Sequence, residues 1–128
     1  MTQVIQKTEW KDFFDRISRT FLEWEMSVQV MSDDAGAQML SEGLPFNGLT
    51  YDESHGHNEM EVAIGMGTEN HQTHNIKDPQ KVAFEPSGRG PGGTLDIEDA
   101  SGTKTLINFI QPMPVLAEYV KSEILTVN

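Results

Sequence analysis

The stretch that decides the fold is Trp10-Lys11-Asp12-Phe13-Phe14-Asp15-Arg16-Ile17-Ser18-Arg19-Thr20-Phe21. Its large apolar residues recur at intervals of three and four positions, namely Trp10, Phe13, Phe14, Ile17 and Phe21. This spacing places them on one stripe of an α-helix. We predict a helix over residues 8–22, with Thr8 as its N-cap. Because the stripe is mostly aromatic, the helix must lie against a sizeable apolar partner.

After this helix the apolar period changes from 3.6 to 2. Trp24, Met26, Val28 and Val30 alternate with polar residues, which is typical of a half-buried strand. Further strands are predicted over residues 37–51 (interrupted near Pro45), 60–66, 82–84, 95–97 and 105–110. The sequence Asp99-Ala100-Ser101-Gly102 predicts a hairpin turn.

These elements predict an α+β fold in a single domain over residues 1–128. An N-terminal amphipathic helix packs on a five- to six-stranded, strongly bent antiparallel sheet or small open barrel over residues 24–110. The helix is expected to close one open end of the sheet. A short amphipathic helix or tail follows over residues 112–128. The order of elements is similar to that of Sm-like barrels, in topology only.

Charge and composition exclude several classes of protein. The chain has 20 acidic residues against 9 Lys and Arg, a net charge of −11, and no Lys or Arg between Arg19 and Lys77. Nucleic-acid binding needs a clustered basic face, so we expect no nucleic-acid partner. The same charge repels an anionic membrane surface. The absence of cysteine excludes disulfides, thiolate metal sites and a cysteine nucleophile.

The N-terminal ten residues have no apolar run of signal-peptide length, and no window approaches the roughly 18 apolar residues of a membrane span. We therefore expect a soluble, cytoplasmic protein with no membrane partner.

The four histidines cluster as His55-Gly56-His57 and His71-Gln72-Thr73-His74. Imidazole is the commonest metal ligand in proteins, so these pairs could hold zinc or nickel. A hairpin through residues 67–70 would separate the pairs by about 25 Å at about 3.3 Å per residue. We therefore expect loop histidines and no cofactor, with His55 and His57 the pair best placed to capture a metal.

The letters Gly88-Arg89-Gly90-Pro91-Gly92-Gly93 match the dinucleotide fingerprint G-x-G-x-x-G. That fingerprint needs a helix N-terminus after it, whereas here a strand is predicted to follow. We interpret the segment as a hairpin loop.

Several segments between residues 10 and 110 resemble a mostly bacterial family of small proteins classed as a domain of unknown function. They are Trp10-Lys11-Asp12-Phe13-Phe14-Asp15 with Ser18-Arg19, Leu49-Thr50-Tyr51-Asp52, His74-Asn75-Ile76 with Pro79 and Val82, and Leu95-Asp96-Ile97 with Asp99, Gly102 and Leu106-Ile107. The resemblance implies no activity. It singles out two polar positions, His74 and Arg19, as candidate ligand-binding residues.

No convergent set of reactive residues emerges, so we predict a non-catalytic module that binds another protein or itself. The predicted contact patch comprises Leu106, Phe109, Ile110, Val115, Leu116 and Tyr119. We expect a homodimer or larger assembly that depends on the C-terminal segment. One alternative is a small-ligand binder or hydrolase-like enzyme with a pocket near His74. A third is metal binding through the four histidines.

Overall fold

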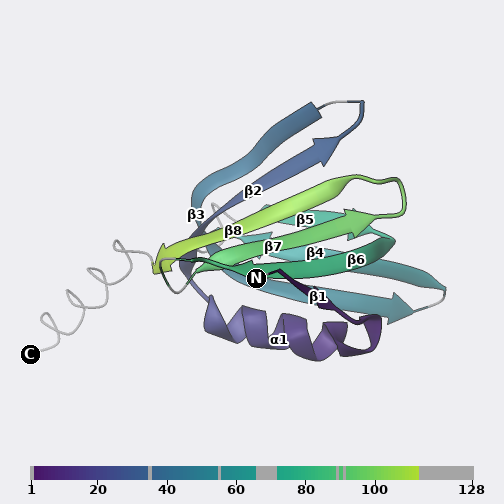
Figure 1. Cartoon of the computed structure of the whole chain (residues 1–128), viewed down its shortest axis with the longest axis horizontal. Coiled ribbons are helices and arrows are strands. Elements are labelled where there is room, and N and C mark those ends of the chain that lie inside the picture. Colours follow the sequence, from purple (N-terminus) through teal and green to yellow (C-terminus); the bar gives the residue numbers. More distant parts are fainter. Residues whose placement is uncertain are drawn as a thin grey trace, which may run out of the picture.

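The computed structural model describes residues 2–34, 36–54, 56–65, 72–88, 90 and 92–112. This part of the chain forms one α-helix and eight strands (Figure 1). The elements are β1 (Gln3–Ile5), a 3-10 helix (Lys7–Glu9), α1 (Trp10–Thr20), β2 (Trp24–Ser32), β3 (Gly36–Ser54), β4 (His57–Ile64), β5 (Gln72–Lys77), β6 (Pro79–Pro86), β7 (Gly93–Asp99) and β8 (Lys104–Pro112). No helix in these ranges is long and apolar enough to cross a membrane.

All strands pair antiparallel in one open sheet, in the order β1-β6-β7-β8-β2-β3-β4-β5. Strand β3 belongs to both halves of the sheet, because its first part pairs with β2 and its last part with β4. Between these parts the chain bends near Pro45, where Gly43 and Gly48 have positive φ angles of 80° and 144°. A side chain at Gly48 would also approach the Ser18 hydroxyl of α1.

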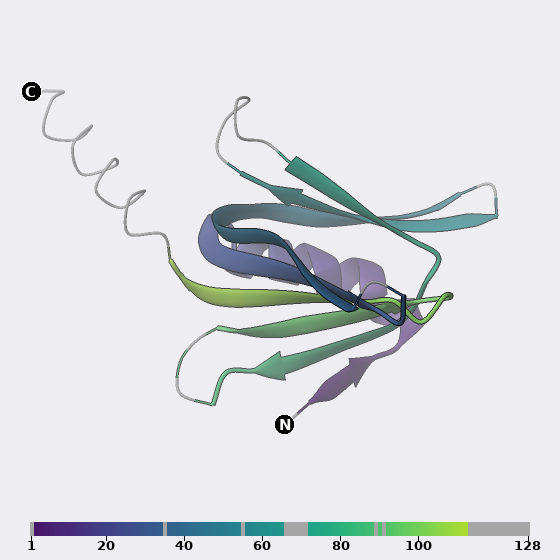
Figure 2. The same cartoon turned by 90° about the horizontal axis from the view of Figure 1, so that it is seen from above.

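The sheet curls until its two edges approach each other. Strands β5 and β6 stand near opposite ends of the strand order, yet only Asp78 separates them in the chain. Asp78 donates its backbone N–H to the carbonyl of Asn58 and accepts a bond from the N–H of Ala100. Figures 1 and 2 show α1 lying lengthwise along the open side of the curl, between β3–β4–β5 and β6–β7–β8. The helix thus runs beside the strands, whereas we expected it to close one end.

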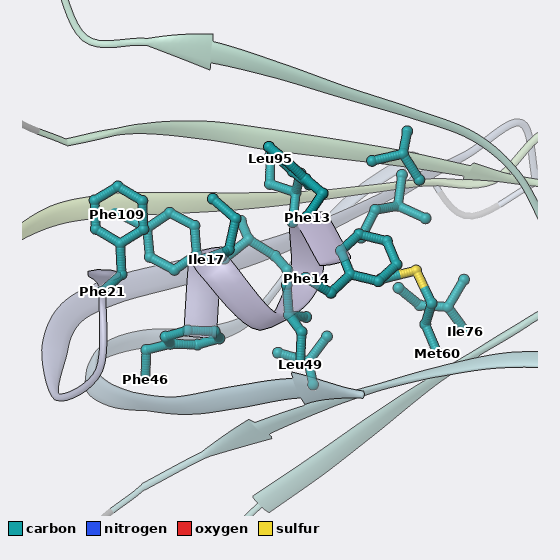
Figure 3. Close-up of a cluster of buried hydrophobic side chains, with 14 of the residues drawn as sticks. Phe13, Phe14, Ile17, Phe21, Phe46, Leu49, Met60, Ile76, Leu95 and Phe109 are labelled. Atoms are coloured by element: carbon teal, nitrogen blue, oxygen red, sulfur yellow. The ribbon is translucent and has the colours of Figure 1, made fainter. Parts of the chain in front are cut away.

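The predicted aromatic stripe of the helix is confirmed. All five of its residues are buried. Figure 3 shows Phe13, Phe14, Ile17 and Phe21 in the space inside the curl. The Phe21 ring stacks on Phe109 of β8, with ring centroids 4.3 Å apart. The N-cap prediction was wrong, since Thr8 lies in the 3-10 helix and Glu9 takes the N-cap position without a side-chain bond.

The sheet has eight strands where we predicted five or six. The two that we missed, β1 and β5, are edge strands with few apolar residues. Strand β1 has only three residues, and β5 buries Ile76 alone, so neither shows an apolar alternation. The predicted helix or tail over residues 112–128 lies outside the described residues, apart from Pro112 at the end of β8.

Both predicted loops between late strands are confirmed. Strand β7 begins at Gly93, the last residue of the glycine-rich segment, so a strand and not a helix follows the dinucleotide-like letters. The β7–β8 turn has Gly102 at a φ of 89°. In that turn the Asp99 carboxylate accepts bonds from the N–H groups of Ser101 and Thr103.

Candidate functional site

The two histidines within the described residues lie far apart. His74 is in β5 opposite Val62 of β4, and it shares the inner side of the sheet with that buried valine. His57 begins β4, is exposed, and points to the other side. His57 and Val62, the residue opposite His74, are five positions apart along β4, a distance of about 17 Å. His55 and His71 lie outside the described residues.

No three His, Asp or Glu side chains among the described residues are grouped to hold a metal ion. The predicted His55–His57 pair is untested because only one of its members is described. Burial lowers the pKa of His74 below its ordinary 6.5. Its imidazole is therefore neutral at pH 7.

Arg19, the second polar position that the resemblance singles out, is exposed in the last turn of α1. It lies nine residues after the buried Trp10, which places the two side chains on opposite sides of the helix. The apolar stripe faces the sheet, so Arg19 points away from it. The structure therefore does not bring Arg19 and His74 together on one face.

A hollow of about 490 Å³ lies at the β3–β4 turn and is lined by Gly56, His57, Asn58, Glu59, Lys77 and Asp78.

Tyr51, on the inner side of β3, makes edge contacts with the rings of Trp10 and Phe14. Its hydroxyl oxygen is buried, and no described group meets it with hydrogen-bond geometry. Burial above all, followed by the nearby Glu53 carboxylate, raises the pKa of Tyr51.

The side of β1, β6, β7, β8, β2 and the first part of β3 that faces away from α1 forms a second surface, which we call the outer face. The strand registers arrange its side chains in three rows across the strands. The first row is Lys81, Glu98, Lys104, Met31 and Ala37; the second is Val4, Ala83, Asp96, Leu106, Gln29 and Met39; the third is Glu85, Thr94, Asn108, Ser27 and Glu42.

Apolar side chains stand exposed on this outer face. Fractional exposures are Val4 53%, Met31 39%, Met39 53% and Ile110 47%. Leu106 is half-buried at the centre, between Asp96 and Gln29. No described helix or strand covers these residues, because α1 occupies the opposite side of the sheet (Figure 1).

The predicted contact patch divides between the two sides of β8. Leu106 and Ile110 belong to the outer face, as an interaction patch requires. Phe109 does not, since it is 3% exposed and packs on Phe21 and Phe46 inside the curl. Val115, Leu116 and Tyr119 lie outside the described residues.

Comparison with known proteins places the chain in a family. Residues 1–117 match the model of the family of unknown function DUF5335.

The chain belongs to the DUF5335 family.

The DUF5335 match extends beyond the residues 10–110 that carried our resemblance. An uncharacterised protein of Aquifex aeolicus (strain VF5) is 26% identical over 114 residues, which are 89% of this chain and 96% of that protein. No solved structure matches the chain. The predicted likeness to Sm-like barrels therefore has no support beyond the order of elements.

Two polar features of the outer face of this DUF5335 domain escaped sequence analysis. The first is a hydrogen-bond chain across three strands, in which the Thr94 hydroxyl donates to Asn108 Oδ1 (2.7 Å) and Asn108 Nδ2 donates to the Ser27 hydroxyl (3.2 Å). These three residues are 14 and 81 positions apart in the chain, so no local pattern connects them.

The second feature is Asp96, in the middle row. Its Oδ1 atom is buried and has no hydrogen-bond partner among the described residues. Two hollows of about 130 and 270 Å³ flank this carboxylate, one toward Lys81 and the other toward Thr94. A buried carboxylate oxygen without a donor is rare in a folded protein, which makes the centre of the outer face suitable for an added donor group.

Proposed function

We propose that this DUF5335 domain is a self-association and protein-interaction module, and that the outer face is its contact surface. One observation carries the proposal: several large apolar side chains stand exposed on the outer face, with no described element over them. Exposed apolar side chains on one face of a folded domain are a common feature of contacts with another protein.

The composition of the outer face supports this function. Its middle row contains the apolar Val4, Leu106 and Met39, with Asp96 beside Leu106. The rows on either side carry Lys81, Glu85 and other charged residues. Apolar groups bordered by polar ones are typical of protein interfaces. Methionine adapts its shape to a partner, which suits Met31 and Met39 at such a site.

The alternatives receive less support from the described residues. The alternative of a ligand or hydrolase-like site near His74 gains nothing from Arg19, because Arg19 points away from the side of the sheet on which His74 lies. The four-histidine metal site is supported by neither His57 nor His74, because they lie on opposite sides of the sheet.

Light scattering of the full-length protein, over a range of concentrations, tests the proposal. We expect a dimer or larger assembly, and we expect Leu106→Asp to raise its dissociation constant at least about tenfold, a change of about 1.4 kcal/mol. Leu22→Asp is the matched control, because Leu22 is exposed but lies outside the outer face. A wild-type protein that stays monomeric at every concentration would refute the proposal.

The predicted contribution of residues 113–128 has its own test. The buried apolar residues of the described core all lie between Ile5 and Phe109, so a chain that ends at Pro112 keeps them. We expect this shorter chain to associate more weakly than the full-length protein. An unchanged mass would show that the C-terminal segment takes no part.

A further inference from the structure

We infer that the partner on the outer face is a second copy of this chain, stacked sheet on sheet about a twofold axis that runs along the strands between β7 and β8. The inference rests on the proposed function and adds the identity and orientation of the partner.

The outer face is centred on the β7–β8 pair. Its six strands follow the order β1-β6-β7-β8-β2-β3, so β7 and β8 are the two middle strands (Figure 1). A twofold axis along the strands at this centre places β8 over β7 of the second copy, β2 over β6, and β3 over β1. Each row then faces the same row of the second copy, because the axis does not move residues along the strands. Aligned packing of this kind is a standard arrangement of two stacked sheets.

Charges and apolar groups complement each other in this arrangement. In the first row, Lys104 faces Glu98 of the second copy. In the middle row, the exposed Val4 faces Met39, and Asp96 lies opposite Leu106 with Gln29 and its amide donor nearby. The twofold axis produces each of these contacts twice. Within the three rows, no carboxylate lies directly opposite a carboxylate and no ammonium lies directly opposite an ammonium.

The other simple twofold arrangement is much less favourable. An axis that lies across the strands, along the middle row, would place each residue of that row over its own copy. Asp96 would then face Asp96 of the second copy, with Oδ1 of both carboxylates buried and unpartnered. Like charges directly opposite each other across an interface are strongly destabilising. The charge pattern therefore selects the axis along the strands.

The size of the outer face is sufficient for a specific dimer. Six strands spaced about 4.8 Å apart are about 29 Å wide, and the six steps along β8 from Lys104 to Ile110 span about 20 Å. The face therefore offers about 600 Å² per copy, or about 1,200 Å² in total, at the lower end of the range of stable protein interfaces. An assembly of this size depends on its charge complementarity.

The test uses two variants, each of which reverses one charge of the Lys104–Glu98 pair. Lys104→Glu and Glu98→Lys each place like charges at these positions, both within one chain and across a homodimer. We expect each variant alone to dimerise at least tenfold more weakly than the wild type. The two variants are then mixed in equal amounts, with one of them labelled with ¹⁵N. In this mixture, positions 98 and 104 carry opposite charges only where a chain of one variant faces a chain of the other. We expect native mass spectrometry to show heterodimer well above the random half.

The matched control is the cross-strand pair Glu59 and Lys77, on β4 and β5, outside the outer face. Glu59→Lys and Lys77→Glu should dimerise like the wild type and mix at random. Circular dichroism establishes that each variant is folded. If the wild type dimerises but the Lys104 and Glu98 variants also mix at random, the stacking arrangement is wrong while self-association stands. If the wild type is monomeric, the proposed function fails as well.

Discussion

Glu23 and Asp78 are non-glycine residues with positive φ angles, of 65° and 54°. Each lies where the chain turns sharply, Glu23 between α1 and β2 and Asp78 between β5 and β6. Aspartate tolerates this conformation better than glutamate does, because its short side chain can bond locally. Asp78 does so by accepting a bond from Gln80 at its own Oδ1. Glu23 is exposed and is the less suitable residue at its position.

Replacing Glu23 with glycine should therefore stabilise the protein. We expect Glu23→Gly to raise the free energy of unfolding by about 0.5–1 kcal/mol, because glycine adopts a positive φ without a steric cost. Urea denaturation measures the change. The control is Glu42→Gly, an exposed strand residue at which glycine should lower stability by about 0.5–1 kcal/mol. Equal losses in the two variants would contradict the assigned strain.

His74 should make stability depend on pH. Because burial lowers its pKa in the folded state, the unfolded chain binds the proton more readily. The contribution of neutral His74 is therefore complete above pH 6.5 and is lost progressively as the pH falls below that value. We expect the unfolding free energy of His74→Gln to fall less than that of the wild type between pH 7.5 and 5.5. Identical slopes in the wild type and His74→Gln would exclude His74 as the cause.

At the scale of elements, the success of the sequence prediction follows the strength of local periodicity. Helix α1 and strand β2 have long apolar patterns, and both were predicted within a few residues. Edge strand β5 has no such pattern, because only one side of it touches the core at Ile76. Residues 105–110 have apolar side chains at both odd and even positions, so the sequence pattern alone does not show that Phe109 faces the core while Leu106 and Ile110 face outward. The outer face itself combines residues from β1 to β8, and only the strand order brings them together.

One hydroxyl of α1 makes two hydrogen bonds to the backbone of β3, in addition to the ring contacts with Tyr51. Ser18 Oγ accepts a bond from the N–H of Leu49 (2.9 Å) and donates to the carbonyl of the same residue (3.3 Å). We expect Ser18→Ala to lower the unfolding free energy by about 1–3 kcal/mol, because it leaves partly buried backbone groups unsatisfied. Thermal or urea denaturation measures this loss. Thr20→Ala, at an exposed position of the same helix, should change stability by less than about 0.5 kcal/mol; a similar loss there would mean that helix propensity is the cause.

At the scale of the whole molecule, the curled sheet remains open because its edge strands, β1 and β5, do not pair with each other. At one corner Asp78 joins β5 to β6, the neighbour of β1, and the Asn58 and Ala100 backbone groups hold Asp78 in place. Elsewhere α1 lies between the two halves, so its aromatic stripe takes the place that further strand pairing would have in a closed barrel (Figure 2). The strand order thus leaves β1 and β5 with a pairing partner on one side only.

The rates of amide hydrogen exchange, measured by mass spectrometry, should follow the position of each strand in the sheet. Strands β7, β8 and β2 pair on both sides and bury Leu95, Ile107 and Val28 completely, so their amides should exchange slowest, through near-global unfolding. The amides of β1 and β5 should exchange first, since opening an edge strand breaks one ladder and exposes little apolar surface. Separate peptides covering β5 and β6 are decisive, because these strands adjoin in sequence but differ in pairing. Equal protection in β5 and β6 would contradict the proposed strand order.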